Sequence, residues 1–374
     1  MEEDAGPMSA GRLEACTTRG HSAGGHINAM SGRDYREEIQ IALAGEAPAH
    51  VPFTLYDNVV PERMDLTPLQ ARGLAICTGR AVHKVITPNV TAKTITEPDG
   101  SVRAIWVTPR GTVTSLHRRI GWNVLCAVEH PIKSRDDYAV VEFIVNDRRY
   151  EPSYDKFVST REKIGASGIV LGVVGRSPLL EIQIEWLGQE RFCYELADNE
   201  DALMGLYQAM VKKQRELLEI VARSPVEYVL YCGNLVAEMI GLDRVRDYVF
   251  PCYNGFADLL HESGKKMGVH LDANNRLILD LVRDSSIDFV EAFTPPPDCN
   301  VSVAEARAAW PGKCLWVNFP SSVHLSPDEE IRKATREIIR QAGDRKGFLM
   351  GITEDVPLEH LPRSISAILD VLNE

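Results

Sequence analysis

The chain has 374 residues, a length that suits two or three ordinary domains or one large barrel. Hydrophobic residues make up 44% and charged residues 25%, which is typical of a globular protein and excludes wholesale disorder. The 53 acidic residues outnumber the 41 basic ones, for a formal net charge of −12 at pH 7. This balance excludes nucleic acid as the main partner, because binding phosphates requires a basic face.

The 8 cysteines are scattered, and no two of them form a C-x-x-C pair. Their spacing fits neither a disulfide framework nor a zinc finger and predicts a reducing, cytoplasmic location. No apolar run approaches the roughly 18 residues of a membrane span, and the acidic start of the chain has no apolar signal segment. We therefore expect no membrane association.

Residues 1–32 are rich in Gly, Ser, Ala, Thr and His and show no periodicity, so we expect a disordered tail. Met30 directly precedes the first strong pattern, and we hypothesise that the native chain starts there. Residues 33–374 are expected to form a single domain.

The first elements of this domain are a helix and a strand. Residues 35–43 have a helical pattern that ends at Gly45, and residues 51–56 form an apolar strand candidate. Residues 82–125 alternate between apolar and polar side chains, with Asp99 and Gly100 as a hairpin turn. They predict a small antiparallel excursion outside the main repeat.

The rest of the chain alternates short apolar strands with amphipathic helices. The strand candidates are 169–174, 227–232, 266–270, 289–292, 315–317 and 348–351. Such alternation is typical of βα units with a parallel sheet. Length and repeat number favour an α/β fold of the closed (β/α)8 or TIM barrel type, preceded by the small helical and antiparallel excursion.

Two helices in this part have capping boxes. Ser302 with Glu305 predicts one helix start, and Ser326 with Glu329 predicts another, with a proline at its first position. The second helix is expected to end at Gly343. No glycine-rich phosphate loop follows any strand and no G-x-S-x-G turn occurs, which disfavours nucleotide cofactors and a hydrolase serine.

Polar side chains end or follow several of the apolar strands. They are Tyr56, Asn234, His270, Asp272, Glu291, Asn318 and Glu354. In a (β/α)8 barrel the carboxyl ends of the strands meet at one mouth, where the chemistry takes place. We therefore expect these residues to gather there.

His270 and Asp272 are the first metal-ligand candidates. Residues i and i+2 of an extended segment point to the same face, so an imidazole and a carboxylate converge. With Glu354 as a donor from a neighbouring strand, they make an open zinc site conceivable. The alternative is that Asp272 only orients His270 or caps the helix that starts near Asn274.

Glu291 is a candidate for three roles, as a general base, a metal ligand or a helix-cap partner. Asn234 and Asn318 can hydrogen-bond a substrate, although an asparagine after a strand is also a common turn former.

Several stretches resemble the uroporphyrinogen decarboxylase superfamily. They are residues 35–52, 108–112, 129–134, 264–272 with its strand-end His270, and 347–362, in the right order. The resemblance implies a (β/α)8 barrel. True decarboxylases of this superfamily carry an arginine-rich segment near the first strand, and residues 53–59 contain no arginine. The chain is therefore more similar to the corrinoid-dependent methyltransferases.

That branch holds zinc through a His-x-Cys pair at a strand end and a Cys after the last strand. His270 matches the first position, whereas Asp272 and Glu354 stand where the cysteines would be. A His/Asp/Glu set is harder than a thiolate set and suits polarising an ether, hydroxyl or carboxylate oxygen.

The main hypothesis is a zinc-dependent methyltransferase that moves a methyl group between a small, O-methylated or similar substrate and a corrinoid protein. His270, Asp272 and Glu354 would hold Zn²⁺, and a partner protein would supply the corrinoid (cobalamin). Glu291 and His270 would be catalytic, with Tyr56, Asn234 and Asn318 binding the substrate. A homodimer is compatible with the sequence.

Two alternatives remain open. One is a metal-free decarboxylase or lyase of the same superfamily, which would bind a small carboxylic acid through Arg176, His117 and Lys133. The other is a non-catalytic barrel that binds a tetrapyrrole or a corrinoid.

Overall fold

The structure is a computed structural model that describes residues 33–61, 64–120 and 124–374. The predicted tail of residues 1–32, including Met30, lies outside the described residues. The contacts divide the chain into two compact units. The barrel unit comprises residues 33–80, Asp155–Val174 and Pro225–Glu374, and the insertion unit comprises Ala81–Tyr154 and Gly175–Ser224. The insertion unit thus joins the predicted excursion of residues 82–125 with Gly175–Ser224, and the single domain expected over residues 33–374 stays a prediction.

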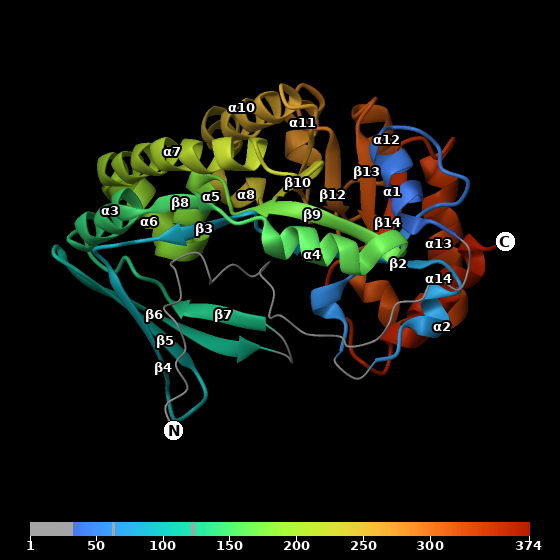
Figure 1. The fold of residues 1–374 in the computed structure, drawn as a ribbon, viewed down its shortest axis with the longest axis horizontal. Coiled ribbons are helices and arrows are strands. Elements are labelled where there is room, and N and C mark those ends of the chain that lie inside the picture. The colour runs from blue at the N-terminus through green and yellow to red at the C-terminus, as the bar shows by residue number, and fades with distance from the viewer. Residues whose placement is uncertain (1–32, 62–63, 121–123) are drawn as a thin grey trace. The chain divides into compact units, whose positions relative to one another are not determined.

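Eight parallel strands close the barrel unit, which confirms the predicted (β/α)8 fold (Figure 1). Each strand pairs with its neighbours in chain order, and β1 pairs with β14 to complete the ring. The strands are β1 (Phe53–Tyr56), β2 (Leu74–Arg80), β9 (Gly168–Val174), β10 (Tyr228–Tyr231), β11 (Lys266–His270), β12 (Phe289–Phe293), β13 (Cys314–Asn318) and β14 (Phe348–Ile352).

Helices precede, connect and follow the strands of this barrel. The longer ones are α1 (Tyr35–Leu43), α4 (Asp155–Ile164), α10 (Phe250–His261), α13 (Asp328–Ala342) and α14 (Leu361–Leu372), and the short ones are α2 (Thr67–Gln70), α8 (Ala237–Ile240), α9 (Leu242–Arg244), α11 (Leu279–Arg283) and α12 (Val303–Ala309). Strands β9, β12, β13 and β14 are buried along their whole length. Their sequences are apolar apart from Glu291 in β12 and Asn318 at the end of β13, as a parallel sheet covered on both faces requires.

The two predicted capping boxes have different outcomes. Ser302 and Glu305 form a complete capping box at the start of α12, as predicted. The box at Ser326 and Glu329 is wrong: α13 begins one residue later, with Pro327 at the N-cap position and no side-chain cap. The ring nitrogen of Pro327 carries no hydrogen, so this residue has no backbone N–H that would need a hydrogen-bond partner at the start of α13. The helix ends at Gly343, whose φ of 70° is left-handed as expected.

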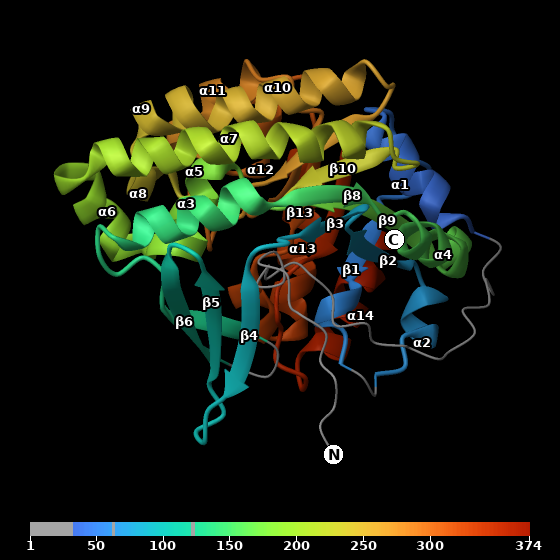
Figure 2. The same cartoon turned by 60° about the vertical axis from the view of Figure 1, so that its left-hand side comes forward.

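The insertion unit combines helices with two small antiparallel sheets (Figure 2). Its strands are β3 (His83–Ile86) paired with β8 (Arg149–Pro152), and β4 (Thr91–Thr96), β5 (Val102–Thr108), β6 (Gly111–Ile120) and β7 (Val124–Glu129) in one sheet. The predicted turn joins β4 and β5, with Gly100 at a φ of 82°. The helices are α3 (Asp137–Asp147), α5 (Pro178–Glu181), the π-helical turn η3 (Ile182–Leu187), α6 (Gln189–Asp198) and α7 (Glu200–Ala222). Helix α3 packs on α7.

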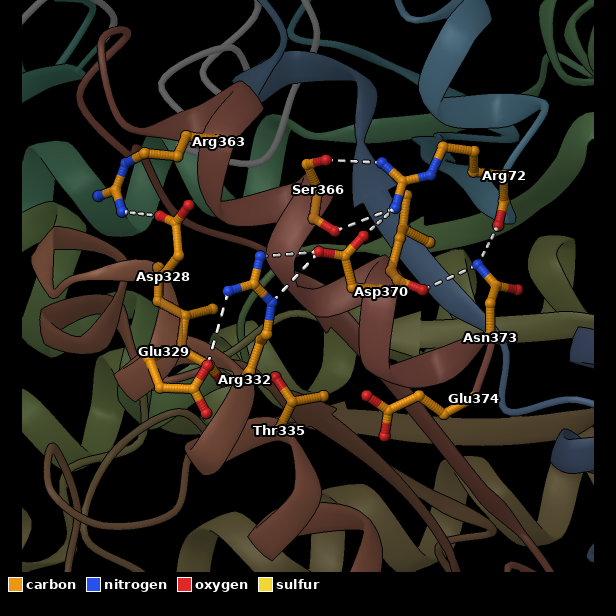
Figure 3. Close-up of polar contacts among 12 residues, drawn as sticks. Arg72, Asp328, Glu329, Arg332, Thr335, Arg363, Ser366, Asp370, Asn373 and Glu374 are labelled. Atoms are coloured by element: carbon orange, nitrogen blue, oxygen red, sulfur yellow. Dashed lines mark hydrogen bonds and ion pairs between the residues drawn. The ribbon is translucent and has the colours of Figure 1, made fainter.

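An ion-pair network ties α13 and α14 of the barrel unit together (Figure 3). Asp370 on α14 accepts from Arg332 of α13 at 2.9 Å and from Arg72, which follows α2, at 2.6 Å. Arg363 of α14 pairs with Asp328 at the start of α13. These side chains are partly exposed and screened by solvent, so each pair contributes little to the free energy of unfolding. Across the described parts of the chain, no helix has the length and apolar character to cross a bilayer.

His324 makes the stability of the barrel unit depend on pH. This residue follows β13, is 1% exposed, and its Nδ1 lies 2.6 Å from the hydroxyl of Ser364 on α14. Burial lowers the pKa of His324 to about 4, although Asp298 opposes the shift. In the unfolded chain the imidazole of His324 takes up a proton near pH 6.5, whereas in the folded protein it stays neutral down to about pH 4. The neutral His324 therefore contributes fully to stability above pH 6.5, and this contribution is lost as the pH falls towards 4.

We expect the wild type to lose roughly 2 kcal/mol more free energy of unfolding between pH 7 and pH 5 than a His324→Gln variant. Denaturant titrations at both pH values measure the difference. Equal losses in the two proteins would contradict the prediction.

Candidate active site

A chain of hydrogen bonds crosses the carboxyl ends of the barrel strands. The hydroxyl of Tyr56, the last residue of β1, donates to Oε1 of Glu291 on β12 at 2.5 Å. The other oxygen of Glu291, Oε2, lies 2.6 Å from Nδ1 of His270, the last residue of β11. One carboxylate therefore bridges a phenol and an imidazole from two other strands.

The series of hydrogen bonds continues on the far side of the imidazole ring of His270. Nε2 of His270 lies 3.2 Å from Oδ2 of Asp272, and the side-chain amide of Asn234 donates to the same oxygen at 3.4 Å. The structure thus brings together five of the residues expected at the mouth. We refer to Tyr56, Glu291, His270, Asp272 and Asn234 as the mouth network.

Burial and charge act in opposite directions in this network. Glu291 is fully buried and the side chain of His270 is 12% exposed. Burial alone would lower the pKa of His270, but the charge of the Glu291 carboxylate and the hydrogen bonds that His270 donates to Asp272 and Glu291 together raise it well above its ordinary value. For Asp272, burial raises the pKa, but the hydrogen bond and charge of His270 outweigh it and hold the pKa below the usual range. The favoured state is an imidazolium between two carboxylates.

Irregular backbone conformations orient two of these side chains, Glu291 and Asn234. The pairing of β12 with β13 shifts register between Val290 and Phe293, which places one extra residue in β12 beside Glu291. Ala292 at this bulge has a φ of 58°, and Asn234 has a φ of 75°. Asparagine tolerates the left-handed region, whereas alanine there costs about 1–2 kcal/mol. Bulges next to functional sites commonly redirect a side chain, and this one lies at Glu291.

Asn318 and Glu354 belong to a second cluster. Oδ1 of Asn318 accepts from both the backbone N–H and the hydroxyl of Thr353, each at 3.1 Å. Glu354 accepts from the hydroxyl of Ser321 at 2.7 Å and from the amide of Asn318 at 3.5 Å. Asn318 is fully buried and holds the loop after β14. Its predicted role in substrate binding is not tested by these contacts.

The predicted zinc ligands do not come together as a set of three. Nε2 of His270 and Oδ2 of Asp272 are spaced much like two ligands of one tetrahedral zinc, which would lie roughly 3.3 Å apart. Glu354, however, is engaged with Ser321 and Asn318. In the part of the chain that the structure describes, no group of three or more His, Cys, Asp or Glu side chains could hold a metal ion. The residues therefore do not fit zinc as predicted.

Strand β2 adds residues that were not among the candidates. Thr78 donates to Oδ2 of Asp57 at 2.6 Å, and Arg80 reaches the same oxygen at 3.0 Å. Cys77 is fully buried beside Tyr56, and burial together with the charges of Glu291 and Asp57 raises the pKa of its thiol. The apolar run Leu74–Cys77 after Gly73 is the signal that could have revealed this strand.

The three basic residues considered for carboxylate binding lie in the insertion unit. Arg176 pairs with Glu185, and Lys133 pairs with Glu129 at 3.0 Å. His117 is buried within β6, where burial and the charge of His130 lower its pKa. All three side chains therefore contact other residues of the insertion unit.

One likeness to a solved structure agrees with the barrel. A methyltransferase from Methanosarcina mazei has 12% identity to this chain and a TM-score of 0.57, covering 91% of this chain and 98% of the other. A Bacteroidetes-affiliated GH5 cellulase has 11% identity and a TM-score of 0.43, with coverage of 91% and 95%. At these identities the first likeness shows the fold alone. No curated protein matches the sequence. The family model of uroporphyrinogen decarboxylase (URO-D) matches residues 120–374, more than half of the chain, and the protein therefore belongs to this family.

Proposed function

We propose that this protein is a methyltransferase that moves a methyl group between a small O-methylated substrate and a corrinoid protein. The observation that carries the proposal is the mouth network, in which a fully buried Glu291 joins Tyr56 to His270. The carboxyl end of a (β/α)8 barrel is where enzymes of this fold carry out their chemistry. A buried pair of acid and base held by several strands at that end is a candidate catalytic device.

The chemistry of demethylation explains why such a network is useful. When the bond between the methyl carbon and the oxygen breaks, the oxygen keeps the electron pair and must receive a proton or a comparable positive charge. Glu291 fixes the orientation of the His270 ring, and His270 together with Asp272 presents the proton-carrying side. The corrinoid, supplied by a partner protein, would accept the methyl group. Asn234 and Tyr56 would orient the substrate.

The charge at the mouth favours a small substrate over a polyanionic tetrapyrrole. Residues 53–59 contain no arginine. Arg80 ends β2, and its guanidinium already contacts Asp57 and Thr78. Several carboxylates of a tetrapyrrole would need more counter-charges than this arrangement offers.

A metal-free decarboxylase or lyase is the second candidate. The mouth network is a complete set of acid and base without a third metal donor, and protonating a carbanion after the loss of CO₂ requires the same proton. Both reactions therefore use His270 and differ in the bond that breaks.

The two candidates can be separated with purified protein and two substrate panels. Free cob(I)alamin serves as the acceptor for a set of small methyl ethers, and the loss of its absorbance reports methyl transfer. Release of CO₂ from a set of small carboxylic acids reports the alternative. We expect the wild type to catalyse methyl transfer. The rate of this reaction should fall at least 100-fold in His270→Gln and change less than about 5-fold in Glu354→Gln. Corrinoid binding without turnover on either panel would contradict both enzymatic functions.

Zinc remains a separate prediction that the same preparations test by elemental analysis. About one zinc per chain, lost in Asp272→Ala, would support a metal at His270 and Asp272. Loss of activity in Glu354→Gln together with loss of zinc would restore the predicted three-ligand site. Sub-stoichiometric zinc in both wild type and Asp272→Ala would remove zinc and leave the proton role of the mouth network in place.

A further inference from the structure

The insertion unit contains a cavity of about 70 Å³ that no step of the proposed function uses. A buried water needs roughly 10–15 Å³ on this measure, so the cavity has room for about five to seven waters or for one small molecule. Its polar and aromatic lining comes from the loops that precede β8 and α5, from β8 itself, from the end of α5 and from η3. These residues include Arg148, Tyr150, Arg176, Glu181, Glu185 and Trp186.

Two cations and two anions line this cavity as two ion pairs. Arg148 lies 2.6 Å from Glu181, and Arg176 pairs with Glu185. The two guanidinium side chains are each 10% exposed, and the carboxylates are 20% and 23% exposed. Taking four charges out of water costs more than such pairs return in most proteins, so a purely structural role explains them poorly. The lining is electrically balanced.

Aromatic and apolar groups complete the lining. The guanidinium of Arg148 lies over the ring of Trp186 at 5.9 Å, and the indole of Trp186 donates to Glu181 at 3.1 Å. Val85, Met210 and Leu217 supply apolar walls. An alkylated ammonium group is stabilised by aromatic faces and a nearby carboxylate, and a carboxylate is stabilised by guanidinium groups.

His83 provides an independent sign of a ligand. This residue lines the same cavity, and its buried Nδ1 has no hydrogen-bond partner among the residues that the structure describes. Burial lowers the pKa of His83 to about 4, so the imidazole is neutral at pH 7. A buried polar atom without a partner is costly unless something else satisfies it.

We propose that this cavity binds a small zwitterion that carries one carboxylate and one alkylated ammonium group. A ligand with a single net charge would leave an unbalanced charge in a buried and neutral lining, whereas a zwitterion preserves the balance. Its carboxylate would lie towards Arg148 and Arg176, and its ammonium group towards Glu181, Glu185 and the Trp186 ring. This binding site is independent of the proposed function at the barrel mouth.

The test uses three probes of nearly equal shape and different charge. Glycine betaine carries both charges, 3,3-dimethylbutyrate replaces the ammonium nitrogen by carbon, and choline lacks the carboxylate. Calorimetric titration of the full chain is expected to show glycine betaine binding at least 10-fold more tightly than either of the other two. Equal binding of 3,3-dimethylbutyrate would make this an anion site and overturn the zwitterion. Equal binding of choline would do the same in favour of a cation site, and absence of binding by all three at millimolar concentration would overturn the proposal outright.

Variants separate ligand contact from a structural role. Glu185→Gln is expected to weaken glycine betaine binding at least 10-fold and to leave 3,3-dimethylbutyrate binding unchanged or stronger, because only the ammonium loses its partner. The matched control is Glu97→Gln, which removes one of the two carboxylates paired with Arg103, in the same unit but outside the cavity. It should leave all three affinities within 2-fold. A parallel loss for all three probes in Glu185→Gln would indicate a structural role and contradict the assignment.

Discussion

Replacing Glu291 by glutamine is expected to lower turnover by about 10²–10⁴-fold while the protein remains folded. In the wild type each oxygen of this carboxylate has its own partner, Tyr56 on one side and His270 on the other. A glutamine keeps the shape but has only one acceptor, and its NH₂ group faces one of the two former donors. The imidazole thereby loses both a counter-charge and the bond that fixes its orientation.

The measurement is steady-state kinetics on the substrate class identified with the wild type, with kcat and KM determined separately. Glu291→Gln should act mainly on kcat, because Glu291 is fully buried behind His270. Tyr56→Phe removes only one of the two bonds to Glu291 and should cause a smaller loss. Unchanged kcat in Glu291→Gln, or an effect confined to KM, would contradict a role in positioning the catalytic imidazole.

The barrel could be predicted because seven of its eight strands are short, mainly apolar segments. Strand β9 is a clear case, since Ile169–Val174 contains only apolar residues and glycine and is buried throughout. The missed strand was β2, Leu74–Arg80, whose second half contains Thr78, Gly79 and Arg80. A polar strand end of this kind has the composition of a loop, and its role becomes visible only when β1 and β9 pair on either side of it.

Most of the candidate site could be predicted by placing polar residues at strand ends, because parallel strands of a barrel end at one mouth. The contact between Tyr56 and Glu291 could not be predicted, since it joins β1 to β12 across the barrel and depends on strand tilt and stagger. The bulge at Ala292 also escaped prediction, because alanine gives no signal for a left-handed residue. Glu354 follows β14, as predicted, but the conformation of the loop pairs its carboxylate with Ser321.

Gly168→Ala is expected to destabilise the barrel unit by at least about 3 kcal/mol. Gly168 begins β9 and lies opposite Ile76 of β2. A Cβ atom built at this position would lie 1.9 Å from the carbonyl oxygen of Ile76 and less than 3 Å from two more of its backbone atoms. Backbone atoms in a closed ring of strands cannot move aside without breaking the pairing of β2 with β9, so the barrel has to distort.

Two further glycines of the barrel unit calibrate this effect. At Gly79 an added Cβ would meet a methyl group of Val173 at 2.6 Å, and a side chain can shift more easily than a backbone, so Gly79→Ala should cost less. At Gly255, within α10, an added Cβ would meet no described atom within 4 Å beyond its chain neighbours and its own helix backbone, and Gly255→Ala should stabilise the protein by about 0.5–1 kcal/mol. Urea denaturation of the three variants, or their soluble yield where one fails to fold, gives the order of stability. A Gly168→Ala variant as stable as Gly255→Ala would mean that β2 and β9 do not approach as closely as the closed barrel requires.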